Sequence, residues 1–139
     1  MWCKKVLFTY PLVGPNQEAL IYLNNNYPQT VFSTLVDHQD QLISWISNPI
    51  NLYIDINVGM KRTDIKLNKL SKFINLISRE TCFNLVGIHA YYGHNNHRDL
   101  HKRKTQFKND FTRYLKNFRQ LKFWKLRNSL WQKYYFPHT

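Results

Sequence analysis

The chain has 139 residues, of which 43% are hydrophobic and 16% are aromatic. This composition excludes a disordered chain, and the length excludes a complete (β/α)8 barrel, which needs about 250 residues. The formal net charge is +12, and residues 97–139 carry +10 of it, because twelve lysines and arginines there outnumber two aspartates.

The first part of the chain alternates between strand-like and helix-like patterns. Runs of β-branched and aromatic residues predict strands near residues 5–10 and 31–36. Between them, Pro15 suits the first position of a helix that we expect to end at residues 22–23. After the second strand, Asp37 is the predicted N-cap of another helix.

Regular alternation over residues 52–58 predicts a third strand with aliphatic side chains on one face. Asp55 and Asn57 lie on the other face, which would point into the interior of a barrel. The alternative is an ordinary strand with one polar face. After this strand, Thr63 or Asp64 is the predicted N-cap of an amphipathic helix.

A fourth strand is predicted over residues 84–92, and a helical pattern follows Asp99. Repeated alternation of strands and helices implies parallel strands joined by right-handed crossovers. The sequence therefore predicts an α/β fold, either an open sheet or part of a barrel. In both architectures, functional residues lie beyond the carboxyl ends of the strands.

Several classes of protein are disfavoured by what the sequence lacks. Cys3 and Cys82 form neither a zinc-finger spacing nor a disulfide framework. His94 and His97 form a His-x-x-His pair, but two ligands without a third do not predict a metal site. The sequence contains neither a signal-peptide pattern nor about 18 consecutive apolar residues. We therefore expect a cytoplasmic protein without a membrane-spanning helix.

Three segments carry a resemblance to a known family. Tyr53–Thr63 resembles the Asp-x-(Asp/Asn/Thr)-x-Gly-Met-x-Arg strand and turn of fold-type III pyridoxal phosphate (PLP) enzymes, the alanine racemase N-terminal-domain-like family. Gly87–His94 is similar to the Gly-(Leu/Ile)-x-x-Tyr-x-Gly-His segment of its D-threonine aldolase and D-serine dehydratase branch. Val6–Pro15 looks like the third-strand region of that branch. The segments occur in the family's order over about residues 4–100.

The resemblance implies that residues 1–100 form an incomplete (β/α)8 barrel of the TIM type. Residues 101–139 do not share the resemblance, and their composition predicts a basic, aromatic-rich helical tail. The resemblance also implies PLP as the cofactor and a D-amino acid as the substrate. By this resemblance, Arg62 matches the arginine that approaches the PLP 3′-oxygen, and Tyr91 matches the residue that packs on the pyridine ring. His94 is expected to line the mouth of the barrel.

The sequence departs from the family at two positions. The family's Schiff-base lysine lies on the first barrel strand, whereas Lys4 and Lys5 precede a strand that matches the third. Asp64 stands where the family usually has glycine. We therefore assign no catalytic residue and expect a truncated relative, from a gene fragment or a frameshift, that is inactive alone.

Two other functions compete with this interpretation. One is a small basic protein that binds nucleic acid or another polyanion through residues 97–139, where lysines and arginines alternate with aromatic residues. No RNP, KH or zinc motif supports it, although weak, salt-sensitive polyanion binding is expected from the charge alone. The other is a membrane-surface helix, whose apolar residues do not fall on one stripe. We expect residues 119–139 to pack poorly.

Overall fold

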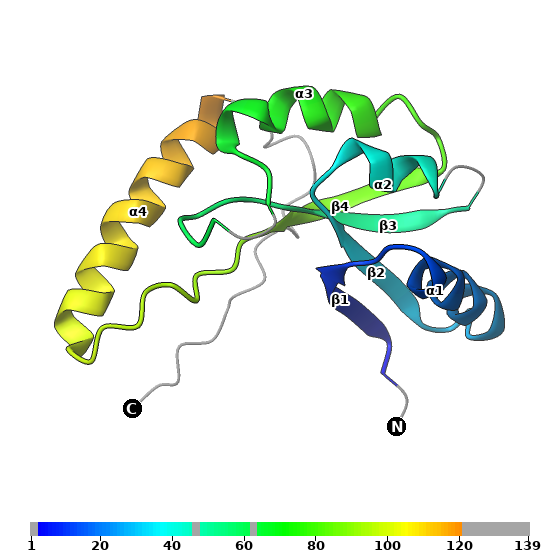
Figure 1. The fold of residues 1–139 in the computed structure, drawn as a ribbon, viewed down its shortest axis with the longest axis horizontal. Coiled ribbons are helices and arrows are strands. Elements are labelled where there is room, and N and C mark those ends of the chain that lie inside the picture. Colours follow the sequence, from blue (N-terminus) through cyan, green and yellow to red (C-terminus); the bar gives the residue numbers. More distant parts are fainter. Residues whose placement is uncertain (1–2, 46–47, 62–63, 121–139) are drawn as a thin grey trace.

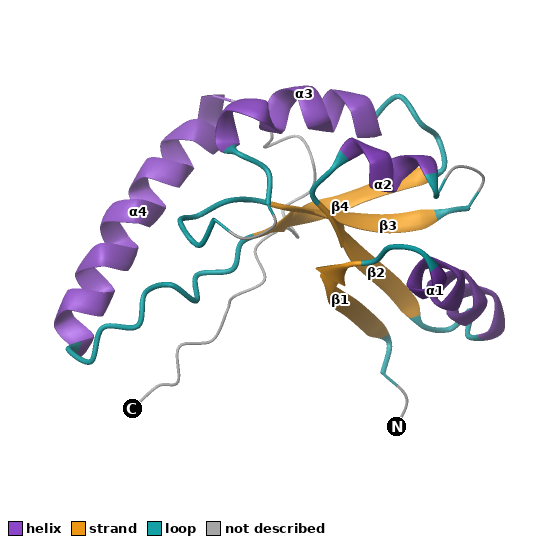
Figure 2. Ribbon diagram, in the orientation of Figure 1, coloured by secondary structure: helices purple, strands orange, loops and turns teal. Residues whose placement is uncertain are grey.

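The computed structural model describes residues 3–45, 48–61 and 64–120. In these residues, four strands alternate with four helices (Figures 1 and 2), so the predicted α/β class is confirmed. The strands pair in parallel, in the order β1-β2-β3-β4, as predicted. They are β1 (Lys5–Pro11), β2 (Val31–Val36), β3 (Ile50–Asp55) and β4 (Phe83–His89). The helices are α1 (Pro15–Asn26), α2 (Gln39–Ile43), α3 (Leu67–Ile77) and α4 (Leu100–Gln120).

The third and fourth strands are shorter than predicted. β3 ends at Asp55 and β4 ends at His89, whereas the alternation extends to residues 58 and 92. Beyond Asp55 the chain hydrogen-bonds to its own following loop: the amide of Asn57 donates to the carbonyl of Ile65 at 3.0 Å, and the amide of Ile65 donates to Asp55 at 2.9 Å. The alternating pattern therefore continues into a turn, where it no longer marks a strand.

The predicted N-cap of α2 is wrong by one residue. His38 is the N-cap, and its Nδ1 accepts a hydrogen bond from the amide of Asp40 at 3.3 Å. Gln41 closes the capping box, because its side-chain oxygen accepts from the amide of His38. Asp37 instead accepts a hydrogen bond from the side-chain amide of Gln41 at 2.7 Å. The preceding helix, α1, continues to Asn26, beyond its predicted end.

The predicted N-cap of α3 is also wrong. α3 begins after Lys66, which makes no side-chain capping bond, so neither Thr63 nor Asp64 is the cap. The last helix follows Asp99, as predicted, and the carboxylate of Asp99 accepts from the amide of His101 at 2.8 Å. This bond satisfies one of the amides that a helix N-terminus leaves without a partner.

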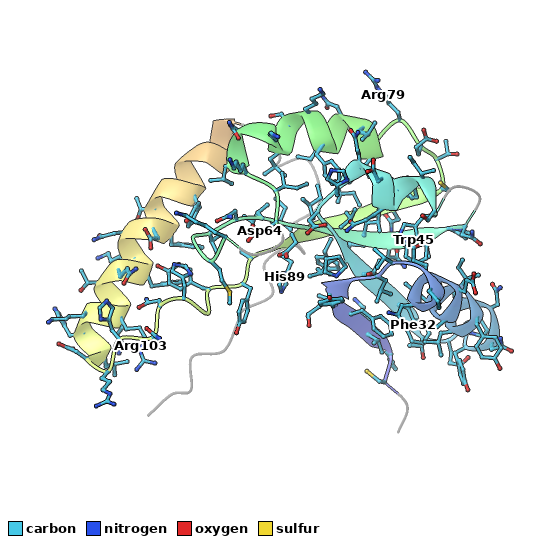
Figure 3. All side chains as sticks on the ribbon, viewed as in Figure 1. Phe32, Trp45, Asp64, Arg79, His89 and Arg103 are labelled. Carbon is cyan, nitrogen blue, oxygen red and sulfur yellow. The ribbon has the colours of Figure 1, made fainter. Side chains whose placement is uncertain are left out.

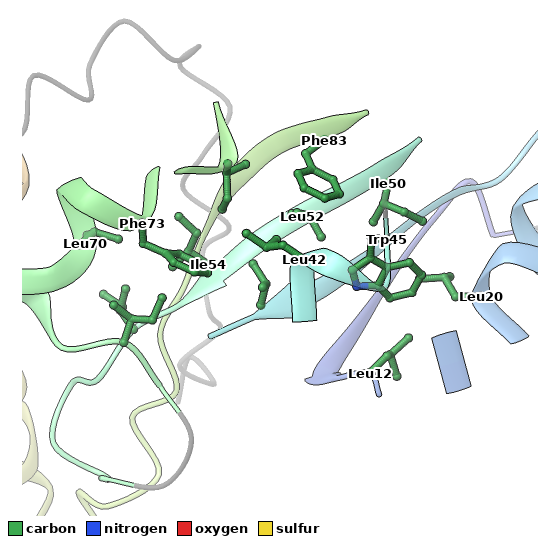
Figure 4. Packing of buried hydrophobic residues seen from close by; sticks show 14 of the residues in the cluster. Leu12, Leu20, Leu42, Trp45, Ile50, Leu52, Ile54, Leu70, Phe73 and Phe83 are labelled. Carbon is green, nitrogen blue, oxygen red and sulfur yellow. The ribbon is translucent and has the colours of Figure 1, made fainter. Parts of the chain in front are cut away.

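The core lies between one face of the sheet and the layer formed by α1, α2 and α3 (Figure 4). Right-handed crossovers between neighbouring parallel strands place the connecting helices on one face, so alternate strand residues must be apolar. Leu52 and Ile54 of β3 are fully buried there, and the predicted aliphatic face is confirmed. The helices contribute Leu20, Leu42, Leu70, Phe73 and Ile77 to the same cluster.

α4 is not part of that helical layer. After β4, residues 90–99 extend past the carboxyl ends of the strands, and α4 lies beyond this end of the sheet (Figure 1). Tyr114 is buried and joins the core cluster, so α4 is attached to the rest of the fold. Residues 121–139, which include most of the segment predicted to pack poorly, lie outside the described residues. Within the described part of the chain, none of the helices has the length and apolarity that a membrane span requires.

We expect Leu52→Ala to lower the free energy of unfolding by about 2–5 kcal/mol, because it leaves a cavity in the middle of the core. Ile43→Ala is the control, since Ile43 on α2 is 66% exposed, and its cost should stay within about 0.5 kcal/mol. Urea unfolding of both variants measures the difference. Equal costs would contradict the described core.

Candidate functional site

A buried aspartate and histidine lie side by side at the carboxyl ends of β3 and β4, the strands at which the Tyr53–Thr63 and Gly87–His94 motifs begin. The register of β3 and β4 makes Asp55 and His89 direct partners. Nδ1 of His89 lies 2.7 Å from Oδ1 of Asp55, and each side chain is 6% exposed. A carboxylate bound to one ring nitrogen fixes the orientation of the imidazole. The pair is therefore a rigid polar element on the face of the sheet opposite the helices.

The rest of this face carries further polar residues, which lie toward the amino ends of the strands. The side-chain amide of Asn84 donates to Oδ1 of Asn51 at 2.7 Å. Asn51 in turn donates to the carbonyl of Phe32 at 3.0 Å. Between these amides and Asp55, burial raises the pKa of the Tyr53 phenol, because a phenolate there would lose its hydration. The predicted division of β3 into an aliphatic and a polar face is confirmed.

The turn after β3 is held by the side chain of Asn57. Its Oδ1 accepts a hydrogen bond from the amide of Gly59 at 2.8 Å, and its Nδ2 donates to Oδ1 of Asp64 at 2.7 Å. Asp64 therefore supplies an acceptor that glycine, its counterpart in the resembled motif, lacks. This departure from the motif reinforces the turn instead of opening it.

The two resembling motifs meet at this turn. The imidazole of His94 packs against Gly59, so closely that a Cβ built on Gly59 would lie 2.6 Å from Nε2. Gly59 also has a φ of 122°, which side-chain-bearing residues rarely adopt. Glycine is thus required here both by the backbone and by the close approach of His94. Figure 3 shows that Asp64, from the loop after β3, and His89, at the end of β4, lie in the same region.

Tyr91 and Tyr92 lie in different environments after the end of β4. β4 ends at His89, so the strand predicted to continue to residue 92 does not include Tyr91. Tyr91 is 49% exposed, and its ring lies against Gly93. Tyr92 is instead half-buried, with its ring 4.5 Å from that of His94 in an edge-to-face contact. Tyr92 is therefore the aromatic residue that packs at this edge.

The loop after β4 is fastened to the inward face of α4. The hydroxyl of Tyr92 donates to the carboxylate of Asp110, and its ring packs edge-on against Phe107 at 5.4 Å. The side-chain amide of Asn95 donates to the carbonyl of Arg103 at 2.9 Å. Three buried atoms at this junction have no hydrogen-bond partner among the described residues: Nδ1 of His94, Oδ1 of Asn95 and Nε of Arg103. Buried polar atoms left in this way commonly bond to water or a ligand.

The described residues do not by themselves fit PLP. The cofactor needs a lysine amine that is held in place near its aldehyde, yet every lysine whose side chain the structure describes is exposed. Lys61, the lysine closest in sequence to the Arg62 position, is one of these exposed residues. Arg62 itself lies outside the described residues. The described residues also contain no group of three or more histidine, cysteine, aspartate or glutamate side chains able to hold a metal ion.

Sequence reasoning missed the pairing of Asp55 with His89 and the attachment of the loop to α4. The first had a usable signal, since both residues occupy the polar face of neighbouring predicted strands. The second had none, because it depends on where α4 lies relative to the sheet.

We expect Gly59→Ala to destabilise the fold more than Gly14→Ala. Both glycines have positive φ, 122° and 57°, which costs an alanine about 1–2 kcal/mol, but only Gly59 has an atom within 4 Å of the added Cβ. Adding His94→Ala to Gly59→Ala should recover the steric part of the loss. Chemical unfolding of the three variants and the unmodified chain tests this, and equal costs at the two glycines would refute the contact with His94.

A double-mutant cycle of Asp55→Ala and His89→Ala should give a coupling energy of about 1–3 kcal/mol, because each single change leaves a buried partner without its hydrogen bond. The matched cycle uses Asn51→Ala and Asn84→Ala, whose hydrogen bond is nearer the solvent. Its coupling energy should be smaller. A coupling at Asp55 no larger than that of the asparagine pair would show that the buried bond contributes nothing special to stability.

No protein-family model, no curated protein and no solved structure matches this chain. Its function must therefore be inferred from its own residues and their arrangement.

Proposed function

We propose that this chain is part of a β/α barrel related to the fold-type III PLP enzymes that act on D-amino acids, such as D-threonine aldolase, D-serine dehydratase and alanine racemase. We propose further that these 139 residues have no PLP-dependent activity by themselves. The four consecutive parallel strands correspond to half of the eight strands of such a barrel, and α1, α2 and α3 form a layer on one face as barrel helices would.

The packing of His94 against Gly59 is the observation that best supports this relationship. These residues belong to separate resembling segments, one after β3 and one after β4. In β/α barrels, residues that serve one site come from the ends of several strands. A shared site would need this meeting of the two turns, and the parallel pairing of β3 with β4 allows it.

The lack of activity follows from the lysines. PLP chemistry depends on an amine that bonds to the cofactor and then moves protons at the substrate carbon. An exposed lysine on a long flexible stem is not held against a reacting atom, so the orientation that makes catalysis fast is lost. Each lysine whose side chain the structure describes is of this kind. In this proposal, Tyr91, His94 and Arg62 are the remains of a cofactor site and have no catalytic role.

The test is to mix the full chain with PLP, reduce with borohydride and map the modified lysines, while assaying turnover of D-threonine, D-serine and alanine. We expect labelling spread over many lysines and no turnover. The Lys61→Gln variant is the control, because Lys61 lies in the turn nearest the proposed site, and it should change the labelling only at that position. Stoichiometric labelling of one lysine together with turnover would refute the proposal.

A second function is favoured by the charges on α4. We propose that the chain also binds polyanions weakly, in a cytoplasmic setting that suits its free cysteines, Cys3 and Cys82. Among the described residues, the two salt bridges are histidine–carboxylate pairs, so neither involves a lysine or an arginine. The positive charge of α4 is therefore not neutralised by neighbouring carboxylates and attracts anions in a salt-dependent manner.

A further inference from the structure

α4 presents two chemically different faces. Its inward face carries Phe107, Asp110, Phe111 and Tyr114, which are buried or half-buried. Phe107 and Phe111 stack at 5.4 Å, and Tyr114 joins the core cluster. These positions recur at the helical period of 3.6 residues, so they form one stripe. The other side of α4 is thus left to face solvent.

The solvent-facing side carries unpaired cations. Lys102, Lys104 and Lys108 are exposed, as is Arg98 just before the helix. None of them has a carboxylate within 4.0 Å in the described part of the chain. The two acidic residues nearby are already engaged: Asp99 caps the helix, and Asp110 accepts from Tyr92. The local acids therefore leave the cations available to a partner.

A shallow groove runs along α4 from its solvent-facing side to Asp110 at the edge of the inward face, and its lining apart from the Asp110 carboxylate suits phosphate oxygens. Lys102 contributes a cation, and most of the other lining side chains have N–H or O–H groups that donate hydrogen bonds. Successive turns of the helix place such groups about 6 Å apart along its axis. The lining residues are His97, His101, Lys102, Thr105, Gln106, Asn109 and Asp110.

The same groove offers little to a lipid surface or to stacked bases. Its lining contains no phenylalanine, tyrosine or tryptophan, and Phe107, Phe111 and Tyr114 of α4 lie on the inward face. A helix that lies on a membrane needs an exposed apolar face, and among the α4 side chains that the structure describes only Leu100, at 48% exposure, is a large exposed apolar one. Base stacking on single strands needs exposed rings. A chain of phosphodiesters can bind the cations and accept hydrogen bonds from the donors. It requires neither an exposed apolar face nor exposed rings for stacking.

We propose that the solvent-facing side of α4, with Arg98, Lys102, Lys104 and Lys108, binds the phosphate backbone of a nucleic acid without reading its sequence. This inference rests on the proposed polyanion binding and assigns that binding to one surface and one class of partner. Backbone contacts alone position a protein on nucleic acid but carry no sequence information. Affinity should therefore fall steeply with salt and vary little with sequence.

The experiment compares two charge-matched triple variants of the full chain. The first is Lys102→Gln, Lys104→Gln, Lys108→Gln on α4; the second is Lys66→Gln, Lys69→Gln, Lys72→Gln at α3, where the lysines are equally exposed. Binding to a labelled DNA duplex is measured by fluorescence anisotropy between 50 and 200 mM salt. We expect the α4 variant to lower the slope of log K against log salt by about one unit for each lysine in contact. The α3 variant should keep the slope of the unmodified chain.

Four outcomes would overturn the inference. Equal weakening by both triple variants would mean that net charge, or a basic segment elsewhere, attracts the duplex, and the broader polyanion proposal would survive. A preference above about tenfold between two unrelated duplex sequences would contradict backbone recognition. Loss of binding to anionic lipid vesicles but not to duplex in the α4 variant would assign the surface to membranes. Absence of any duplex binding by the unmodified chain at 50 mM salt would refute the polyanion proposal itself.

Discussion

The parallel register between β3 and β4 determines where the candidate functional residues lie. It sets Asp55 beside His89 at 2.7 Å and brings the turn after β3 against the loop after β4. A slip of one residue would turn Asp55 toward the helices and Ile54 toward the polar face, since side chains alternate along a strand. The register is protected against such a slip because Ile54 is fully buried in the core and the two polar side chains satisfy each other. Packing and site geometry are thus fixed by the same constraint.

The buried pair has a cost that the aliphatic face must offset. Removing a carboxylate and an imidazole from water is unfavourable, and a hydrogen bond between them recovers only part of that loss. Replacing such a pair by apolar residues of similar volume is often neutral or stabilising. The polar face therefore contributes less to stability than to specificity: only one register lets Asp55 and His89 find each other. This division of labour is common where a sheet carries a site on one face and a core on the other.

The sequence predicted the elements and failed at their ends for identifiable reasons. β-branched runs and helical stripes located the strands and helices, because burial on one face enforces those periods. The alternation past Asp55 wrongly predicted a longer strand. Asn57 and Ile65 close a turn there through hydrogen bonds, which a periodic pattern of apolar residues does not reveal. His38 was missed as a cap because histidine is uncommon there and Asp37 was the expected choice. The motifs located both turns of the site. The different exposures of Tyr91 and Tyr92 could not be predicted, because they depend on where β4 ends.

The two proposals meet in the chemistry of PLP, which is both an aldehyde and a phosphate. A basic helix face attracts the phosphate group and raises the local concentration of the aldehyde, so lysines on α4 would be labelled without any cofactor site. Labelling of Lys102, Lys104 or Lys108 therefore supports no catalytic role. Labelling at a cofactor site and labelling by charge attraction can be distinguished by adding duplex or salt. A bound duplex shields the lysines that touch its backbone, and higher salt weakens the attraction of lysines for phosphate. Neither duplex nor higher salt would protect a lysine in a cofactor site from modification. Stoichiometric modification of one lysine that persists with duplex present would thus argue for the barrel site, and modification of the α4 lysines that disappears would argue for the surface of α4.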